Sequence, residues 1–375
     1  MSQYADFITQ IDSLPELVKT EARQIDDRMR LLLKTPEIYG IRQVILLGSG
    51  DSYFAAQAVA PAIRAWTGLP VSAMLAMEAA RYVDAGVPPL AGRNRGLLVV
   101  SISSSGEAAR VVEATQRLRK LGALTLGVTA SPDSRLGKSA ERILGITIPS
   151  STNAPGTRSY VASMLAGYSI GLRLAEVLMT MTMDVANALR TEITGLSDKL
   201  AEANKISAGP ILELADLWQQ FRSADILGSG PALASAGYGA AKLVEAAGVH
   251  ATAQDAEEFH HLNYFVAAPD QTPVVAFAAG SARAASRTLE LVGTLEGLGR
   301  PALIITDAAE LPAYGTQLRL PEVREWFAPL VHTVPAAHLA AAWAEKIGIT
   351  HYRGHTGPWR HAQGAGLVRN SALEV

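Results

Sequence analysis

Residues 99–107, with the sequence VVSISSSGE, place four serines between an apolar run and an amphipathic stretch. Residues 97–100 are apolar, as a short buried parallel strand would be, and residues 107–121 repeat apolar side chains at helical spacing. Hydroxyls and free backbone N–H groups at such a strand-to-helix turn favour an anion, for which phosphate is the obvious candidate. One serine would suffice to cap the helix, so four of them favour an anion-binding loop. These serines are Ser101, Ser103, Ser104 and Ser105.

A second turn of this kind, GSGDSY, begins at Gly48 and follows another apolar run. Gly48 and Gly50 would let the chain turn tightly, while Ser49 and Ser52 offer further hydroxyls. The turn is not a dinucleotide-binding motif, because the third glycine of G-x-G-x-x-G and the later acidic residue are missing. A dinucleotide-binding oxidoreductase is therefore a minor alternative. We expect this turn and the serine loop to lie on neighbouring strands and to enclose one sugar phosphate.

A further group of reactive side chains lies on an alanine-rich stretch that ends near residue 248. Lys242 and Glu245 are three residues apart, so on a helix they share a face and could form an ordinary ion pair. The rest of this stretch is small and apolar, which predicts a buried element. Burial raises the pKa of a carboxyl group toward neutrality, as suits a general base. Further along, Glu258 precedes His261 by three residues and is expected to orient its imidazole.

The histidines do not predict a metal site. His260 and His261 are adjacent and would face different directions on a helix. His351, His355 and His361 are spread over a glycine-rich segment, where hydrogen-bonded loop residues are more common than ligands. No H-E-x-x-H motif occurs, and we expect no metal.

The composition predicts a cytoplasmic protein of two or so domains. The chain has 375 residues, 49% of them hydrophobic, and a formal net charge of −2, which gives no broad attraction to nucleic acid or acidic membranes. It has no cysteine, which excludes disulfides and thiolate chemistry. The N-terminus lacks the apolar core of a signal peptide, and no run approaches the ~18 apolar residues of a membrane span.

The chain also repeats itself. GSGDSY at Gly48 is echoed by GSGPAL at Gly228, and later segments of the two halves match in the same order. We expect an α/β fold of two tandem domains, each a mainly parallel sheet with helices on both faces. The expected segments are a helical lead-in (1–35), a first domain (36–197) and a second domain (205–375). The second half has mostly lost the loop hydroxyls, so it is expected to be a scaffold; its residues there are Ala278, Ala279, Gly280, Ser281 and Ala282.

GSGDSY and SISSSGEAA together resemble the SIS (sugar isomerase) domain, and the duplication resembles tandem SIS proteins. That group includes the isomerase half of glucosamine-6-phosphate synthase and the fructoselysine-6-phosphate deglycases. The second half contains YGAAKLVEAAG, then EEFHH, which is similar to the family's lysine–glutamate helix and later glutamate–histidine pair. The resemblance covers nearly the whole chain from about residue 41.

The resemblance implies roles for individual residues. Lys242 and Glu245 fall on the catalytic lysine and glutamate, and the glutamate moves a proton between C1 and C2 of the sugar. His261, donated by the other subunit of a homodimer, would assist ring opening or the leaving group. Such proton transfer needs no cofactor, and we expect none. The implied substrate-binding residues are Ser49, Gly50, Asp51, Ser52, Ser103, Ser104, Ser105, Glu258 and Asn370.

The sequence departs from the family pattern at three of its positions. Asp51 and Ala108 replace threonines, and Asn370 replaces the C-terminal lysine with which the synthase opens its ketose ring. Because an anion would repel Asp51, we expect this carboxylate to face the sugar or an amine of the substrate. There is also no N-terminal glutaminase domain, so the synthase activity is not implied.

These observations favour a phosphosugar isomerase, with action on an amino- or amine-linked sugar phosphate as a deaminase or deglycase left open. The alternative is a non-catalytic sugar-phosphate-binding regulatory protein, since SIS domains also serve as effector-binding modules. Lys242 would stabilise the developing enolate charge, Glu245 would move the proton, and His261 would act as the acid.

Overall fold

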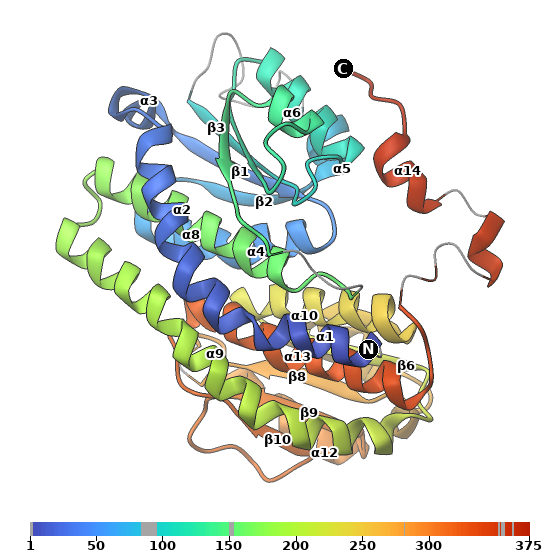
Figure 1. Cartoon of the computed structure of the whole chain (residues 1–375). Coiled ribbons are helices and arrows are strands. Elements are labelled where there is room, and N and C mark those ends of the chain that lie inside the picture. The colour runs from blue at the N-terminus through green and yellow to red at the C-terminus, as the bar shows by residue number, and fades with distance from the viewer. Residues whose placement is uncertain are drawn as a thin grey trace. The chain divides into compact units, whose positions relative to one another are not determined.

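The computed structural model describes residues 3–83, 96–149, 154–280, 282–351, 353, 357–361 and 364–375. The described residues contain two five-stranded parallel sheets (Figure 1). They divide into two compact units. One holds residues 17–149, 158–195 and 353–375 and contains the first sheet; the other holds residues 1–16, 150–157 and 196–352 and contains the second.

The first sheet has the strand order β2-β1-β3-β4-β5, with every neighbouring pair parallel. Its central strands are rich in leucine, valine and isoleucine and buried on both faces, as strands covered by helices must be. The chain order reverses between β1 and β3, and ligands in such folds bind at the carboxyl ends of the strands at this point. The strands are β1 (Gln43–Gly48), β2 (Val71–Leu75), β3 (Leu97–Ile102), β4 (Leu124–Thr129) and β5 (Arg142–Gly145).

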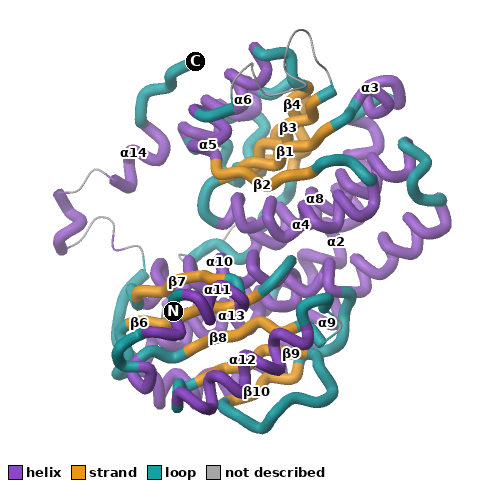
Figure 2. Tube along the Cα trace, turned by 180° about the vertical axis from the view of Figure 1, so that it is seen from behind, coloured by secondary structure: helices purple, strands orange, loops and turns teal. Residues whose placement is uncertain are grey.

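Helices cover both faces of the first sheet. On one face, α5 (Ala76–Arg81) and α6 (Ala109–Lys120) pack their alanines and valines against β1 and β3. On the other face, α4 (Asp51–Thr67) contacts β1 and β2 and packs along α8 (Arg158–Val177), as Figure 2 shows from behind. Two shorter helices, α3 (Thr35–Gly40) and α7 (Arg135–Ser139), complete this unit's helical layer.

The second sheet has the order β10-β9-β8-β6-β7, again all parallel, which is the same order as in the first sheet when each is numbered along the chain. Helices α11 and α12 share one apolar cluster with this sheet, and α10 and α13 pack together. The strands are β6 (Ser223–Gly228), β7 (His250–Gln254), β8 (Val274–Ala278), β9 (Ala302–Thr306) and β10 (Thr316–Arg319); the helices are α10 (Pro231–Lys242), α11 (Ala256–His261), α12 (Ala285–Leu298) and α13 (Ala328–Lys346).

The predicted duplication extends to backbone angles. Gly50, which precedes α4, has φ 54° and ψ −131°, and Gly230, which precedes α10, has φ 59° and ψ −132°. Residues with side chains rarely adopt such angles, so both turns require glycine. The equal strand orders and the equal turns confirm the expected fold class: two tandem domains of parallel sheets flanked by helices.

The lead-in and the connection between the sheets are helical. Helices α1 (Gln3–Asp12) and α2 (Leu14–Leu32) form the lead-in, as expected. The residues between the two expected domains, 198–204, lie inside the continuous helix α9 (Met183–Trp218). After α13 the chain returns to the unit of the first sheet with α14 (Gly364–Asn370). Because the units are discontinuous in sequence, the segment limits given above stay a prediction.

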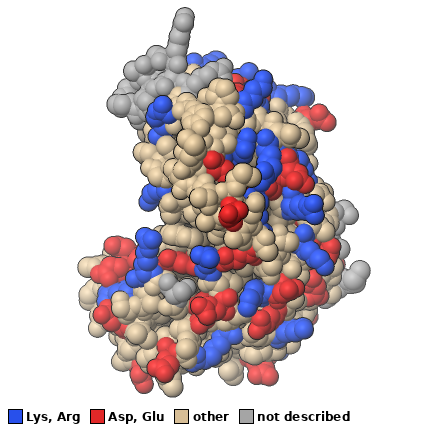
Figure 3. Space-filling view, turned by 90° about the vertical axis from the view of Figure 1, so that its left-hand side faces the viewer, with Lys and Arg blue, Asp and Glu red and all other residues tan. Residues whose placement is uncertain are grey.

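Acidic and basic side chains are interspersed on the face of the molecule that Figure 3 shows. No extended surface of one sign gathers on that face, in agreement with the net charge of −2. Among the described residues, no helix is both long and apolar enough to cross a membrane.

Candidate active site

The two hydroxyl-bearing turns lie at the same edge of the first sheet. Ser49 and Gly50 link β1 to α4, and the serine loop follows β3, the neighbour of β1. Ser103 is 5% exposed, whereas Ser105 is exposed. The structure therefore brings together the residues that were predicted to hold phosphate, at the point where the strand order reverses.

Backbone hydrogen bonds hold the serine loop against β4. The N–H of Ser103 donates to the carbonyl of Val128 at 3.0 Å, and the N–H of Ala130 donates to the carbonyl of Ser104 at 3.0 Å. Helix α6 begins at Ala109 with Ala108 as its N-cap, two residues later than expected. Ser104 and Ser105 therefore do not cap this helix, although Ser105 Oγ accepts the N–H of Glu107 at 3.3 Å within the loop.

Arg135 connects the serine loop to the C-terminal tail. Its backbone N–H and Nε donate to the Glu107 carboxylate at 3.1 and 2.8 Å, and its Nη2 donates to the carbonyl of Arg369 at 2.5 Å. These hydrogen bonds hold the pKa of Glu107 below its usual value. The exposed residue Asn370 follows directly, so the tail that carries it lies beside the serine loop.

The tail has a second attachment on α6. Arg110 Nη2 donates to Ser371 Oγ at 3.0 Å and also bonds the carbonyl of Ala372. The same guanidinium pairs with the fully buried carboxylate of Glu113 at 2.5 Å. No sequence motif marks Arg110 or Arg135 as contacts of the tail, because their partners in the tail lie more than 230 residues away along the chain.

Asp51 begins α4 and is half-buried. Its charge contributes, after burial and the neighbouring Tyr168, to raising the pKa of Tyr160 on α8. The Asp51 carboxylate is thus close to the buried interior of its own domain, and its expected contact with a sugar stays a prediction.

Lys242 and Glu245 form the expected ion pair. Lys242 Nζ lies 2.5 Å from Glu245 Oε2 and 5.3 Å from the centre of the Tyr238 ring. The Lys242 side chain is 0% exposed and the Glu245 side chain 48% exposed. The expectation of a buried carboxylate is therefore wrong, because α10 ends at Lys242 in the π-helical turn Leu243–Ala247, which leaves Glu245 on the surface. Such turns often occur at functional sites.

Helix α11 carries Glu258, His260 and His261. The His261 imidazole lies 3.2 Å from Glu257 Oε1, so the expectation that Glu258 orients it is wrong: the partner is four residues earlier, one helical turn away. His260 turns the other way, toward the carbonyl of Ala256 at 2.9 Å and a threonine of α12. The His261 side chain is 62% exposed and able to reach a molecule outside its own chain.

A buried ion pair holds this segment in place. Arg300, which is fully buried, donates to Asp225 Oδ2 at 2.6 Å and to the carbonyl of Asn263 at 3.0 Å. The Asn263 amide also donates to Asp225 Oδ1 at 2.6 Å. Three large apolar side chains that follow His261 are exposed: Leu262, Tyr264 and Phe265. Sequence reasoning missed Asp225 and Arg300, since isolated charged residues give no sign of pairing.

The histidines and one serine motif bear on other kinds of site. Among the described residues, no group of three histidine, aspartate or glutamate side chains could hold a metal. His351 is buried and packs edge-on against Phe7 at 5.5 Å; His355 lies outside the described residues. The segment GYSIG at 167–171 has the pattern of a serine-hydrolase elbow but lies inside helix α8 rather than at a strand-to-helix turn, so it is not one.

The candidate residues thus form two groups. The serine turns, Asp51 and Asn370 belong to the unit of the first sheet, and Lys242, Glu245, Glu258 and His261 belong to that of the second. The first group offers hydroxyls and backbone N–H groups to an anion. The second offers an acid–base pair, in which a buried ammonium holds a surface carboxylate, and an exposed imidazole.

Residues 37–173 match the family model of the SIS domain. This segment contains the first sheet and both hydroxyl-bearing turns. The resemblance to that family is thus confirmed for this segment, and the second sheet repeats its strand order.

Three proteins show what this chain is similar to. The glutamine–fructose-6-phosphate aminotransferase (isomerizing) of Mycobacterium bovis is 28% identical over 322 residues, which are 84% of this chain and 50% of that protein. The C-terminal domain of glucosamine-fructose-6-phosphate aminotransferase from Francisella tularensis superposes with a TM-score of 0.82 at 19% identity, covering 92% of this chain and 97% of that chain. A glucosamine-6-phosphate deaminase from Thermotoga maritima gives 0.68 at 20%, covering 92% and 96%.

The chain therefore spans about half the length of the curated relatives it matches. The two solved structures, at 19% and 20% identity, share its fold.

Proposed function

We propose that the protein is a phosphosugar isomerase that moves a proton between C1 and C2 of a sugar phosphate, with release of an amine where the substrate carries one at these carbons. The observation that carries this proposal is the ion pair of Lys242 and Glu245. A fully buried ammonium lies 2.5 Å from a half-exposed carboxylate. These are the two positions to which the resemblance assigns the catalytic lysine and glutamate.

The first domain supplies the phosphate site in this proposal. The hydroxyls of Ser52, Ser103, Ser104 and Ser105, with nearby backbone N–H groups, bind the phosphate oxygens, and the turn at Gly50 leaves room for them. Hydrogen bonds to a charged oxygen are stronger than those between neutral groups. Asp51 and Asn370 contact the sugar. Support comes from the position of both turns at the reversal of strand order.

Glu245 acts as the base. Its carboxylate accepts the proton from C2 of the aldose or C1 of the ketose, the electron pair forms the enediolate, and the same carboxyl group returns the proton to the neighbouring carbon. The Lys242 ammonium stabilises the negative charge as it develops on the sugar oxygen. His261 donates or accepts the proton during ring opening. Where the substrate carries an amine, water adds to the imine carbon that the proton shift produces, and His261 protonates the nitrogen as the C–N bond breaks and the carbonyl forms.

The protein functions as a homodimer in this proposal, and His261 acts in the site of the partner subunit. The exposed imidazole and the exposed side chains of Leu262 and Phe265, at 60% and 73%, form one surface segment that supports contact with a second copy.

The Glu245→Gln variant tests the enzyme assignment. Glutamine keeps the shape and some hydrogen bonding of the side chain but cannot accept the proton. We expect affinity for sugar phosphates to stay within a few-fold, while turnover falls by roughly 10²–10⁴, the usual contribution of a general base. In deuterated solvent the wild type exchanges a substrate C–H hydrogen, visible by NMR, and the variant does not.

The matched control is Glu296→Gln, an exposed glutamate on α12, which should exchange like the wild type. Hexose, amino-hexose, pentose and fructosamine phosphates are the substrates to screen. If a sugar phosphate that raises the melting temperature is neither turned over nor exchanged by the wild type, the protein is a sugar-phosphate-binding regulator and the enzyme assignment fails.

A further inference from the structure

The second domain repeats the backbone of the phosphate-binding turns without their hydroxyls. The turn after β6 has Gly230 in the conformation of Gly50. The loop after β8 corresponds to the serine loop, because Val100 pairs with Leu126 in the first sheet and Val275 with Leu303 in the second. Ala278 and Ala279 replace Ser103 and Ser104 there, and Ser281 lies outside the described residues.

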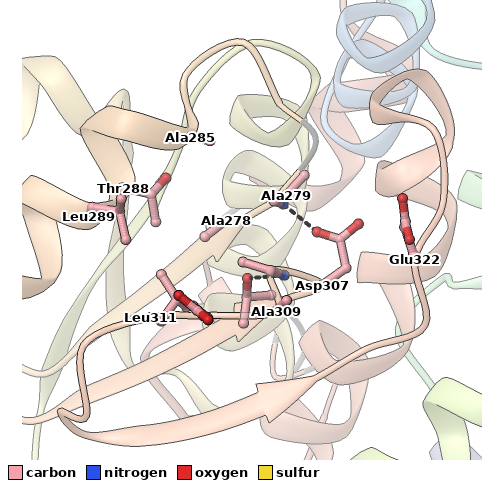
Figure 4. Close-up of a pocket in the computed structure, with 13 residues that line it drawn as sticks. Ala278, Ala279, Ala285, Thr288, Leu289, Asp307, Ala309, Leu311 and Glu322 are labelled. Atoms are coloured by element: carbon pink, nitrogen blue, oxygen red, sulfur yellow. Dashed lines mark hydrogen bonds between the residues drawn. The ribbon is translucent and has the colours of Figure 1, made fainter.

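A carboxylate of the chain occupies one N–H group of this loop. The N–H of Gly280, which corresponds to Ser105, bonds Asp307 Oδ1 (Figure 4). Asp307 follows β9 directly, and the corresponding residue after β4 is Ala130, which has only a methyl group. The acidic side chain is therefore a feature of the second domain alone.

A second carboxylate lies between the two turns. Glu325, on the short helix η4 (Glu325–Phe327), accepts the N–H of Arg283 through Oε1 at 3.3 Å. A Cβ added to Gly230 would lie 3.5 Å from the same oxygen, whereas one added to Gly50 would meet no atom within 4 Å. Arg283 corresponds to Ala108. The Glu325 carboxylate thus occupies, in the second domain, the place that we assign to phosphate in the first.

The second domain has space for an anion beside this loop. A pocket of about 400 Å³ lies next to this loop, at the carboxyl ends of β8 and β9 (Figure 4). Its lining includes the carboxylates of Asp307, Glu310 and Glu322, and none of the described residues that line it is a lysine or arginine. A phosphate there would meet like charges and backbone N–H groups that are already bonded.

We propose that Asp307 and Glu325 are built-in substitutes for the anion, which satisfy the loop N–H groups of the second domain and exclude phosphate from it. Each chain then binds one sugar phosphate, in the first domain. The assignment of the first-domain site rests on the proposed function; the exclusion of phosphate from the second domain does not.

The test uses inorganic phosphate as the probe and the full chain in a Ser103→Ala/Ser105→Ala background, where the first site is removed. With the native second domain, phosphate should not raise the melting temperature. Adding Asp307→Ala, which recreates Ala130, and Glu325→Ala should produce a phosphate-dependent rise, with affinity at least tenfold tighter than in the background. A crystal grown in phosphate should then show the ion between Gly230 and Arg283.

The control adds Glu310→Gln and Glu322→Gln instead, which removes equal charge from the pocket without freeing the loop, and should give no rise. If the alanine variant does not fold, Asp307→Asn with Glu325→Gln removes the charges and keeps the hydrogen bonds, and should give a smaller rise. A folded variant without any gain, or a background protein that still binds phosphate in its second domain, overturns the proposal. If the wild type binds no phosphate but the alanine variant does, only the first-domain assignment fails.

Discussion

Ser103 is almost fully buried at the end of β3, while Ser105, two residues later, is exposed. The two hydroxyls are thus at different depths of one loop, which suits contact with different oxygens of the same phosphate. Backbone bonds to β4 hold the loop, and the Ser105 hydroxyl adds one hydrogen bond within it, from the N–H of Glu107 at 3.3 Å. Because the backbone bonds remain, we expect the fold to persist when the hydroxyls are removed.

At this residue scale, Ser103→Ala with Ser105→Ala should weaken binding of whichever sugar phosphate the wild type binds by about 10²-fold or more. Two charge-assisted hydrogen bonds are lost, each worth roughly 1.5–3 kcal/mol. Isothermal titration calorimetry measures the change. Ser229→Ala, at the equivalent of Ser49 in the second domain, is the control and should bind like the wild type; equal affinity in the double variant would remove the phosphate assignment.

Residue-scale expectations were accurate where local spacing decides the contact. Lys242 and Glu245 pair because side chains three apart on a helix are neighbours in any protein. The exposure of Glu245 depends on the π-helical turn that follows α10, and the partner of His261 depends on how α11 turns its faces. Neither the exposure of Glu245 nor the partner of His261 can be predicted from the spacing of the residues alone.

At the scale of elements, α13 is buried along nearly its whole length and carries two buried histidines. His332 Nδ1 lies 3.0 Å from Ser235 Oγ, and burial lowers the pKa of His332 to about 3. His338 Nε2 lies 2.5 Å from Asn204 Oδ1; burial lowers the pKa of His338 to about 4, against the opposing charge of Asp12. Both imidazoles are therefore neutral in the folded protein at neutral pH.

Because folding lowers the pKa values of His332 and His338, the free energy of unfolding depends on pH. The unfolded chain protonates these imidazoles below about pH 6.5, the folded protein only near pH 3–4, so the stabilisation is full above pH 6.5 and is lost as the pH falls. At pH 5 each histidine should lower the free energy of unfolding by about 2 kcal/mol. Urea unfolding between pH 7.5 and 5 measures the slope. His338→Gln should reduce it; the exposed His250→Gln should not, and equal slopes in both would contradict the assignment.

Elements were predicted well where their pattern is long and periodic, and less well at their ends. The strand before the serine loop and the helix after it both exist, but α6 starts two residues late because the loop is drawn onto β4 by backbone bonds. The two expected domains are joined by one helix, residues 183–218, whose two ends belong to different units. Local sequence does not show to which unit each part of a continuous helix belongs.

At the scale of the whole molecule, the proposed homodimer can be tested by mixing two inactive variants, Glu245→Gln and His261→Asn. If His261 serves the partner's site, a mixed dimer has one site with both lesions and one with neither. After subunit exchange, activity should return to about a quarter of the wild-type value, because half of the dimers are mixed and each has one intact site. Native mass spectrometry of isotope-labelled chains shows whether exchange occurred. Exchange without recovery would place both residues in a site within one chain.

The discontinuity of the two units has a consequence for synthesis on the ribosome. Helix α1 packs against α13 and so has to wait for residues made some 300 positions later. Arg110 and Arg135, in the domain that emerges first, meet the carbonyls of the tail only after the entire second domain has been translated. The first domain begins to fold first and is completed last, so its serine loop acquires its final surroundings when the tail at 364–375 leaves the exit tunnel.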